Sequence, residues 1–215
     1  MPSLPRLYAI LDVDTLAARG LDPATVLDAW LDAGIRLIQL RAKHLSSGPL
    51  LTLAETLAAR ARAAGAMFIV NDRADLALLA GADGVHVGQE DLSPTQVRAL
   101  SGAGLGGQAG LRTIGLSTHT LEQLRAGLTE PADYLAIGPV FSTTTKAHAD
   151  PAVGLAMVEQ AAAMMAGRPL VAIGGITLAT APEVLAAGAT SVAVISDLLG
   201  EDLAARARAW VAICL

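Results

Sequence analysis

Three polar side chains alternate with apolar ones in the segment Ile38–Lys43, near the start of this 215-residue chain. Successive side chains of a β-strand point to opposite faces, so Gln39, Arg41 and Lys43 share one face and the apolar residues share the other. Two cations and an amide that point inward are costly to bury unless an anion meets them. Neighbouring Asp or Glu residues could neutralise them, but two converging cations favour an anion-binding site.

Two later segments end in carboxylates that could hold a metal ion. Asp72 follows the apolar run Met67–Asn71, and Asp91 follows the next run, Gly84–Val87. If these runs are neighbouring strands, the two carboxylates can approach each other and share either a proton or a cation. Beside a phosphate group the natural cation is Mg²⁺, which binds one or two carboxylates together with water and phosphate oxygens. Each Asp alone could instead cap the helix that follows it, but the pair favours a metal.

The second half of the chain offers donors for phosphate oxygens. Four hydroxyl residues and a lysine follow a Gly-Pro turn in Ser142–Lys146, although a plain polar loop is the alternative. Gly174-Gly175 and Val194–Asp197 end the last two apolar runs, and paired glycines allow a phosphate to approach the backbone closely. The chain therefore offers two anion regions. The region with cations and carboxylates suits a diphosphate, and the region with glycines and amides suits a phosphate monoester.

These residues need a scaffold that brings the ends of many strands together. Short apolar runs alternate with longer Ala- and Leu-rich helical patterns, which is typical of βαβ units and a parallel sheet. The eight strand candidates are Leu7–Leu11, Leu37–Arg41, Met67–Asn71, Gly84–Val87, Thr113–Ser117, Tyr134–Pro139, Leu170–Gly174 and Val192–Ser196. Helix starts are predicted at Asp22-Pro23, Ser93–Gln96, Thr120–Gln123 and Thr180–Glu183, and helix ends at Gly34, Gly65, Gly81 and Gly188.

Eight strands, each followed by a helix, predict an α/β fold, a single (β/α)₈ TIM barrel in one domain over residues 1–215. An open doubly wound sheet is disfavoured because no glycine-rich turn follows the first strand. In such a barrel, function resides on the loops that follow the strands. The polar residues named above all lie at those positions.

The composition limits the classes of function. A formal net charge of −5 and an aromatic content of 3% argue against a nucleic-acid binder. Mean hydropathy is high, at +0.51, but charged residues or Pro interrupt each apolar run before the roughly 18 residues of a membrane span. The N-terminus lacks the pattern of a secretion signal, and the single Cys214 excludes an internal disulfide. We expect a cytoplasmic enzyme that acts on small molecules, with homo-oligomerisation left open.

Taken together and in order, the polar motifs resemble the thiamine-phosphate synthase family along nearly the whole chain. The motifs are Gln39–Lys43, Asn71–Arg73, Gly81–Asp91, Ser117–His119, Ala132–Tyr134, Gly138-Pro139, Thr143–Lys146, Ala172–Ile176 and Val194–Ser196. The resemblance implies a barrel enzyme that joins an aminopyrimidine diphosphate to a thiazole phosphate. Diphosphate leaves, thiamine monophosphate forms, and no protein nucleophile is required.

The resemblance also implies a role for each matching residue. The pyrimidine diphosphate would be held by Gln39, Arg41, Lys43, Asn71, Ser117 and Lys146. Arg41, Lys43 and Lys146 would be catalytic because they take up charge as diphosphate departs. Asp72 and Asp91 would hold Mg²⁺. The thiazole phosphate would be held by Thr143, Thr144, Thr145, Gly175, Ile195 and Ser196, with the threonines also within reach of the diphosphate.

Two positions depart from the family pattern, and two other functions compete. Ala42 stands where the family commonly has an acidic residue, and we expect its side chain to face away from the barrel mouth. Ser142 replaces a common Pro, which we expect to loosen that loop. A related group of barrels isomerises a thiazole phosphate carboxylate with a base such as His119, although His119 could equally position its local turn. The carboxylate pair argues against this isomerase, and the complete polar set argues against a phosphate sensor without activity.

Overall fold

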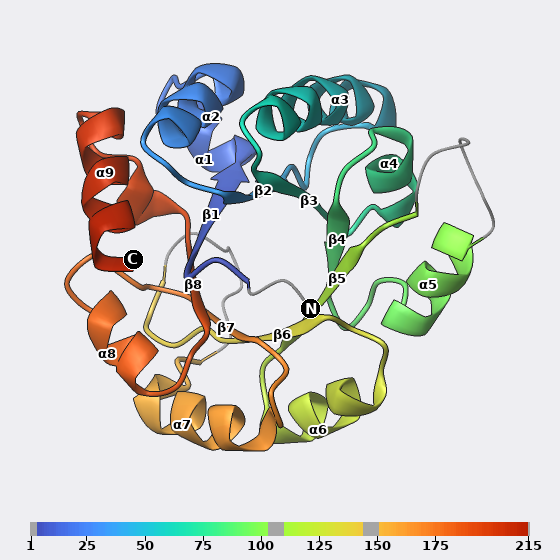
Figure 1. Ribbon diagram of the computed structural model, residues 1–215, viewed down its shortest axis with the longest axis vertical. Helices are drawn as coiled ribbons and strands as arrows, with labels where there is room; N and C mark the ends of the chain where they lie inside the picture. The colour runs from blue at the N-terminus through green and yellow to red at the C-terminus, as the bar shows by residue number, and fades with distance from the viewer. Residues whose placement is uncertain (1–3, 103–109, 144–150, 215) are drawn as a thin grey trace.

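The computed structural model describes residues 4–102, 110–143 and 151–214. These residues form a closed barrel in which the strands follow one another in chain order, and β8 returns to pair with β1 (Figure 1). All the strand pairs are parallel. The predicted (β/α)₈ barrel is therefore confirmed. Within the described ranges no helix is both long and apolar enough to cross a lipid bilayer.

The eight strands lie close to their predicted positions. They are β1 (Leu7–Asp12), β2 (Leu37–Arg41), β3 (Met67–Asn71), β4 (Gly84–Val87), β5 (Thr113–Thr118), β6 (Tyr134–Ile137), β7 (Leu170–Ile173) and β8 (Ser191–Val194). The helices between and after them are α1 (Val13–Ala18), α2 (Pro23–Asp32), α3 (Ser47–Ala63), α4 (Ala74–Leu79), α5 (Pro94–Gly102), α6 (Leu121–Thr129), α7 (Gly154–Met164), α8 (Ala181–Ala186), η2 (Ser196–Leu198) and α9 (Leu203–Cys214).

Three strands end earlier than predicted, β7 by one residue, at Ile173, and β6 and β8 by two residues each. β6 stops at Ile137 because Pro139 has no N–H group to continue the ladder. β8 stops at Val194, since Ile195 has φ −110° and ψ −84° and the short helix η2 begins at Ser196. The two chain segments at these ends line the barrel mouth, so the irregular backbone falls where the candidate site lies.

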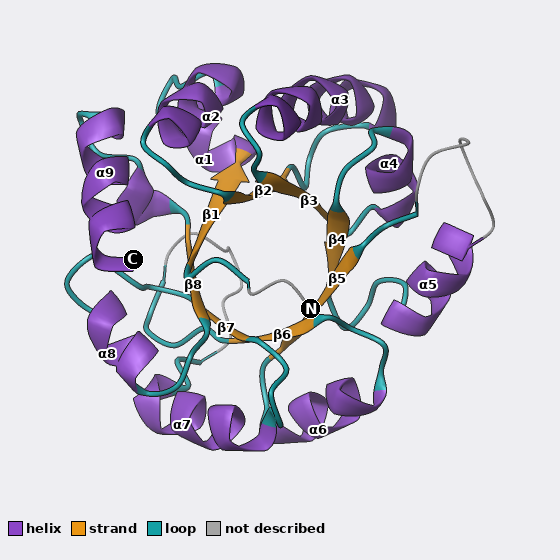
Figure 2. Cartoon of the chain, viewed as in Figure 1, coloured by secondary structure: helices purple, strands orange, loops and turns teal. Residues whose placement is uncertain are grey.

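The helices surround the ring of strands (Figure 2). Side-chain alternation along the strands produces two apolar layers, one on each side of this ring. The larger layer lies between the barrel and the surrounding helices, and Ala42 packs against it as expected. The smaller layer fills the barrel interior and consists of Leu4, Tyr8, Ile10, Leu37, Ile69, Tyr134, Ala136, Val171 and Ala193. The barrel is thus a packed core, and open space occurs at its two ends.

The predicted helix signals are mostly confirmed. The carboxylate of Asp22 accepts a hydrogen bond from the Thr25 amide, and Ser93 and Gln96 form a reciprocal capping box. All four glycines predicted at helix ends have positive φ angles, as a left-handed C-terminal residue requires. The box predicted at Thr180 is wrong, because the Thr180 side chain bonds within its own loop to Thr177 and does not cap α8.

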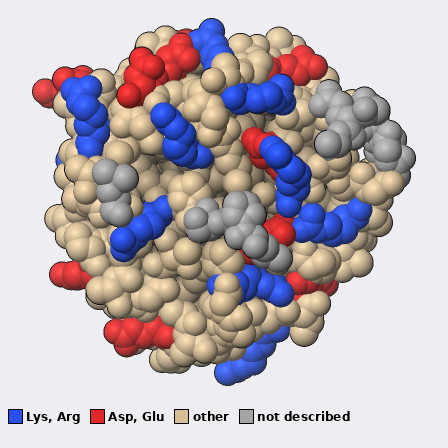
Figure 3. Space-filling model, in the orientation of Figure 1, with Lys and Arg blue, Asp and Glu red and all other residues tan. Residues whose placement is uncertain are grey.

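The N-terminal end of the barrel is fastened by side chains that precede alternate strands. Asp83, just before β4, accepts a hydrogen bond from the Phe68 amide of β3 at 2.9 Å. Asp133, just before β6, accepts one from the Ile114 amide of β5 at 2.6 Å. Arginines then pair with these carboxylates, Arg112 with Asp83 and Arg98 with Asp133. In Figure 3, basic side chains lie in small groups spaced around the face, several of them beside acidic ones.

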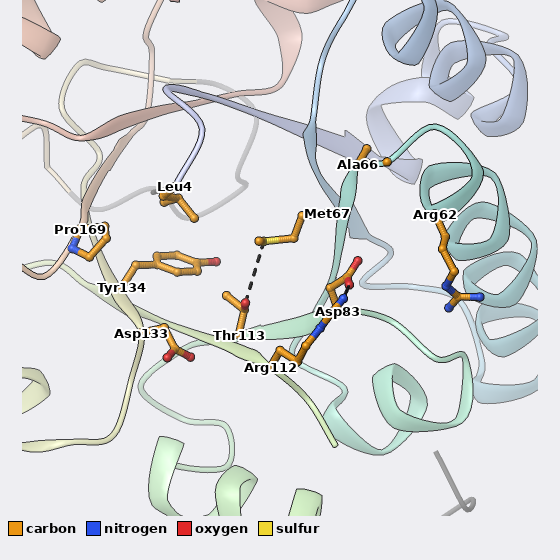
Figure 4. A pocket seen from close by; sticks show the side chains of 11 residues that line it. Leu4, Arg62, Ala66, Met67, Asp83, Arg112, Thr113, Asp133, Tyr134 and Pro169 are labelled. Carbon is orange, nitrogen blue, oxygen red and sulfur yellow. Dashed lines mark hydrogen bonds and ion pairs between the residues drawn. The ribbon is translucent and has the colours of Figure 1, made fainter. Parts of the chain in front are cut away.

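A cavity of about 500 Å³ opens at this N-terminal end. Figure 4 shows Leu4, Met67, Tyr134 and Pro169 around it, with the Asp83–Arg112 pair at its edge. The Thr113 hydroxyl lies 3.9 Å from the Met67 sulfur across this space. The acidic and basic groups of the lining are thus paired with one another or with backbone, and they serve to tie strands together.

Candidate active site

A second cavity, of about 610 Å³, opens at the carboxyl ends of the strands. Its lining includes seven residues predicted for the pyrimidine diphosphate and its metal, namely Gln39, Arg41, Lys43, Asn71, Asp72, Asp91 and Ser117. They come from the ends of β2, β3, β4 and β5 or from the loops that follow. Sequence spacing therefore predicted correctly that these side chains converge, and their individual roles stay predictions.

The two cations at the end of β2 and in the loop after it are each paired with a carboxylate. The Arg41 guanidinium bonds to Asp12, a side chain that is only 2% exposed and also accepts the Thr15 amide at the start of α1. The Lys43 ammonium lies 2.7 Å from the Asp72 carboxylate. Both cations line the cavity as well. The neutralising carboxylates considered from the sequence are thus present. Both paired cations nevertheless remain part of the cavity lining.

Asp72 and Asp91 lie together, as their neighbouring strands predicted. The pKa of the Asp91 carboxyl is raised, first by burial and then by hydrogen bonding to Asp72 and by its charge, while Lys43 acts in the opposite direction. Asp91 also accepts the Gly88 amide at 2.7 Å. Asp72 has a φ of +62°, an uncommon conformation for a residue other than glycine. Two carboxylates are therefore held against each other at a strained turn.

The helix-capping alternative is wrong for both carboxylates. The residue that precedes α4 is Arg73, and no side chain caps that helix. Ser93 provides the cap at the start of α5, not Asp91. With that role excluded, the pair can share either a proton or a cation.

The donor set suits Mg²⁺ better than a metal that needs many protein ligands. Within residues 4–102, 110–143 and 151–214 no group of three or more His, Cys, Asp or Glu side chains could hold a metal ion. Mg²⁺ usually takes only one or two carboxylates and completes its shell with water and phosphate oxygens. Asp72 and Asp91 meet that requirement, and the Lys43 ammonium lies beside them, 2.7 Å from Asp72.

A chain of buried hydrogen bonds forms the floor of this cavity. The Gln39 amide donates to the Tyr8 hydroxyl at 2.8 Å, and the Tyr8 and Tyr134 hydroxyls lie 2.9 Å apart. The Tyr134 hydroxyl lies 2.9 Å from Nδ1 of His86. A tyrosine hydroxyl has one proton and two acceptor positions, so Tyr8 can accept from Gln39 and still bond to Tyr134 in either direction. The tautomer of His86 matches the direction of the bond at its Nδ1.

Burial keeps the two tyrosines neutral, since it raises both of their pKa values well above the ordinary value. Gly115 makes room for it, because a β-carbon there would lie 2.1 Å from the Tyr134 ring and 2.5 Å from His86 Nδ1. Sequence reasoning missed Tyr8, Tyr134 and His86. Their alternation with other inward residues of their strands is the signal that could have found them.

His119 also lines the main cavity and has a defined structural task. Its Nδ1 lies 2.7 Å from the Gly138 carbonyl, which can only accept, so Nδ1 carries a proton. Its backbone amide donates to Gln123 at 2.7 Å, where the predicted capping box would have used the Thr120 amide. His119 therefore links the end of β5 to the end of β6.

A third cavity, of about 450 Å³, lies beside the main one at the ends of β7 and β8. Thr143, Gly175, Ile195 and Ser196, all predicted for the phosphate monoester, line it. Gly175 has a φ of +63°, and a β-carbon there would lie 2.5 Å from the Ser142 carbonyl. Only glycine fits at this close approach. Thr144, Thr145 and Lys146 lie outside the described residues.

The two cavities at the mouth share one wall. Ile173, Ala193 and Ile195 line both of them. The main cavity is bordered by Lys43, Asp72 and other charged groups. The other is bordered by glycines, hydroxyl residues and apolar side chains, and among the described residues Asp197 is its one charged group. Two different molecules can thus lie side by side and meet at an apolar boundary.

A family model described as thiamine monophosphate synthase matches residues 7–198, which includes every strand of the barrel. The chain belongs to the thiamine monophosphate synthase family. A thiamine-phosphate synthase of Koribacter versatilis is 45% identical over 91% of this chain and 90% of its own length. One of Synechococcus sp. is 47% identical over 85% of this chain, and the match spans about half (49%) of that longer relative.

A solved structure supports the same family membership. The thiamine phosphate pyrophosphorylase of Pyrococcus furiosus superimposes with a TM-score of 0.82 and 30% identity, covering 98% of this chain and 96% of that one. The resemblance drawn from the sequence motifs is therefore confirmed at the level of the thiamine monophosphate synthase family. The relatives named above are all called synthases or pyrophosphorylases, and the isomerase alternative gains no support from them.

Proposed function

We propose that this chain is a thiamine-phosphate synthase. It transfers the pyrimidinylmethyl group of 4-amino-2-methyl-5-(diphosphomethyl)pyrimidine to the ring nitrogen of a thiazole phosphate or its carboxylated form. The carbon–oxygen bond to the diphosphate breaks, the electron pair leaves with the diphosphate, and the thiazole nitrogen donates the pair for the new carbon–nitrogen bond. Thiamine monophosphate and diphosphate are the products, together with CO₂ when the thiazole carries its carboxylate. Both substrates are charged metabolites, and we place the reaction in the cytoplasm.

The observation that carries this proposal is the pair of unlike cavities with a common wall. Their volumes, about 610 and 450 Å³, are in the usual range of small-molecule sites. An enzyme with one substrate would not need two anion regions of different chemistry. The shared residues Ile173, Ala193 and Ile195 lie where the reacting carbon and nitrogen would meet, and their apolar side chains exclude water from a cationic intermediate.

In this proposal the charged cavity binds the substrate that loses diphosphate. Arg41 and Lys43 contact diphosphate oxygens, so their positive charge is worth more as negative charge accumulates on the leaving group. Their carboxylate partners fix both side chains before the substrate arrives, which is the preorganisation such stabilisation needs. Lys146, which lies outside the described residues, is assigned the same task on the resemblance alone.

Asp72 and Asp91 would hold Mg²⁺, which when bound neutralises charge on the diphosphate. Asn71 and Ser117 would position the pyrimidine diphosphate from the neighbouring strand ends. Gln39 would act from the cavity floor, where its amide is already fixed by Tyr8. The catalytic task of the chain is then positioning and charge stabilisation, without a covalent intermediate on the protein.

The second cavity anchors the thiazole phosphate. Backbone amides around Gly175 and Ser196 donate to the phosphate, as is common in barrels after the last two strands. Thr143, with Thr144 and Thr145 outside the described residues, adds hydroxyl donors. This phosphate does not react, so its site needs donors but no metal ion.

The decisive experiment supplies both substrates and Mg²⁺ to the purified chain and follows thiamine monophosphate by mass spectrometry. We expect product only when both substrates are present, with one diphosphate released for each thiamine monophosphate. Absence of product with correctly folded protein would contradict the proposal. Isomerisation of the carboxylated thiazole that survives EDTA and stops in a His119→Ala variant would favour the isomerase instead.

A further inference from the structure

Asp197 lies one residue after the start of η2 and lines the cavity assigned to the thiazole phosphate. A single oxygen of its carboxylate, Oδ2, accepts three hydrogen bonds. The donors are the Leu178 amide at 3.0 Å, the Arg206 guanidinium at 2.6 Å and the Trp210 indole at 3.0 Å. No motif of the sequence analysis assigned a role to this residue.

The three donors come from two separate parts of the chain. Leu178 belongs to the loop between β7 and α8, whereas Arg206 and Trp210 belong to α9. Trp210 is fully buried, so its indole is fixed in the outer core. Arg206 holds the same residue a second time, because its Nε donates to the Asp197 carbonyl at 2.8 Å. The carboxylate thus fastens the loop after β7 to the end of β8, with α9 as the support.

The loop after β7 is itself closed into a compact turn. The Thr177 amide donates to the Thr180 hydroxyl at 3.0 Å, and the Thr180 amide lies 3.3 Å from the Thr177 hydroxyl. The Leu178 amide between them is the point at which this turn attaches to Asp197. That attachment sets the separation between the two walls of the cavity, the one carrying Gly175 and the one carrying Ser196.

The charge of Asp197 argues for this indirect task. A carboxylate on the wall of a phosphate site would repel the ligand by direct contact. Here Arg206 compensates the charge, and at least one oxygen is turned toward α9 and the neighbouring loop. The carboxylate is therefore suited to hold the walls of the site, not to touch the phosphate.

We propose that Asp197 is a positioning residue for the thiazole phosphate. It fixes the spacing of the backbone donors at the ends of β7 and β8, and it acts through the Leu178 amide with Arg206 and Trp210 as supports. This inference rests on the proposed function, because it takes the second cavity to be the site of a phosphate monoester.

The test measures steady-state kinetics of an Asp197→Ala variant with each substrate varied in turn. We expect the KM for thiazole phosphate to rise about tenfold, since a charge-assisted hydrogen-bond network is lost. The KM for the pyrimidine diphosphate should stay within about twofold, because that substrate lies across the shared wall. A purely structural role would not separate the two KM values.

Two further variants control for folding. Asp202→Ala removes a carboxylate that accepts the Ala205 amide at the start of α9 but contacts no loop of the cavity. Both KM values should stay at the wild-type level in it. Asp197→Asn keeps an oxygen for the Leu178 amide and the Trp210 indole, so it should restore most of the affinity for thiazole phosphate.

Calorimetric binding of thiazole phosphate to the wild type and to Asp197→Ala separates this proposal from the proposed function. If the wild type binds thiazole phosphate but forms no product, the synthase assignment fails, and the loss of binding in Asp197→Ala still tests the role of the carboxylate. The positioning role is overturned if Asp197→Ala binds as tightly as the wild type. It is also overturned if both KM values rise by the same factor.

Discussion

The two ends of the barrel differ less in the space they enclose than in how their charges are arranged. The N-terminal cavity, of about 500 Å³, is nearly as large as the main cavity of about 610 Å³ at the opposite end. At the N-terminal end, Asp83 and Asp133 each accept a backbone amide of the neighbouring strand and each pair with an arginine. Those carboxylates already have hydrogen-bond and charge partners, so a ligand would gain little by binding to them.

At the C-terminal mouth the charges of the carboxylates are less well compensated. Asp72 and Asp91 lie against each other, the pKa of Asp91 is raised, and Asp72 occupies a left-handed backbone conformation. A cation would relieve the repulsion, and a phosphate group would complete the surroundings of Lys43 and Arg41. The functional end is therefore marked by charges that need a further partner. Cavity volume does not distinguish it.

The buried hydrogen bonds that link Gln39, Tyr8, Tyr134 and His86 separate these two ends of the barrel. We call this group of side chains the partition. Tyr134 lines the N-terminal cavity, while its hydrogen-bond partners Tyr8 and His86 line the main cavity. A change at this partition should therefore affect both stability and binding. Changes at the N-terminal end should affect stability alone, and changes at the C-terminal mouth should affect binding and turnover alone. Variants at four positions test this division.

The largest effect is expected for Asp91→Ala at the mouth. Loss of one of two carboxylates for Mg²⁺ should lower kcat at least about 100-fold, the scale seen when a group that stabilises transition-state charge is removed. The free energy of unfolding should change little, because Asp91 is repelled by Asp72 and is not needed for packing. Enzyme assays at limiting Mg²⁺ and urea denaturation measure the two quantities. Near-normal turnover under these conditions would remove Asp91 from the metal site.

Gly115→Ala tests the partition. The new β-carbon would overlap the Tyr134 ring and His86, and the Tyr134 side chain is fully buried. We expect a loss of about 3 kcal/mol in unfolding free energy, the upper end for overpacking a core. The KM for the pyrimidine diphosphate should rise as well, because Gln39 loses its fixed partner. An unchanged KM would show that the floor of the cavity does not position this substrate.

Asp133→Ala tests the N-terminal end. The variant leaves the Ile114 amide and the Arg98 guanidinium without their acceptor, which should lower stability by about 2 kcal/mol. The kcat of the folded fraction should equal that of the wild type. Asp133→Asn keeps an oxygen for the amide and should recover about half of the loss. A large fall in kcat for either variant would contradict the separation of the two ends.

Much of the fold could be predicted because its signals are local. Alternating apolar runs, helix caps such as Asp22 and glycines at helix ends place the elements, and closed parallel barrels direct strand ends to one mouth. The convergence of Lys43, Asp72 and Asp91 followed from that topology alone. The ends of β6 and β8 were wrongly predicted at Pro139 and Ser196, because irregular backbone begins earlier, after Ile137 and Val194.

The contacts that could not be predicted join residues far apart in the sequence. Tyr8 and Tyr134 are separated by 126 positions, and Arg41 finds its carboxylate 29 positions earlier, at Asp12. Which of many polar residues meet depends on strand register and rotamers, and residue type does not determine these. The Thr180 hydroxyl is a local exception, because it bonds to Thr177 only three positions away although its sequence suited a helix cap.

The smallest effect is expected for Arg112→Ala, which removes the other partner of an N-terminal carboxylate. The Arg112 side chain is 75% exposed, and exposed ion pairs contribute little because water and salt screen them. We expect stability to fall by about 0.5 kcal/mol or less, as measured by urea denaturation at two salt concentrations. Asp83 keeps its bond to the Phe68 amide, so the strand contact survives in this variant. A loss as large as that of Asp133→Ala would mean that the arginines, and not the backbone bonds, hold this end of the barrel together.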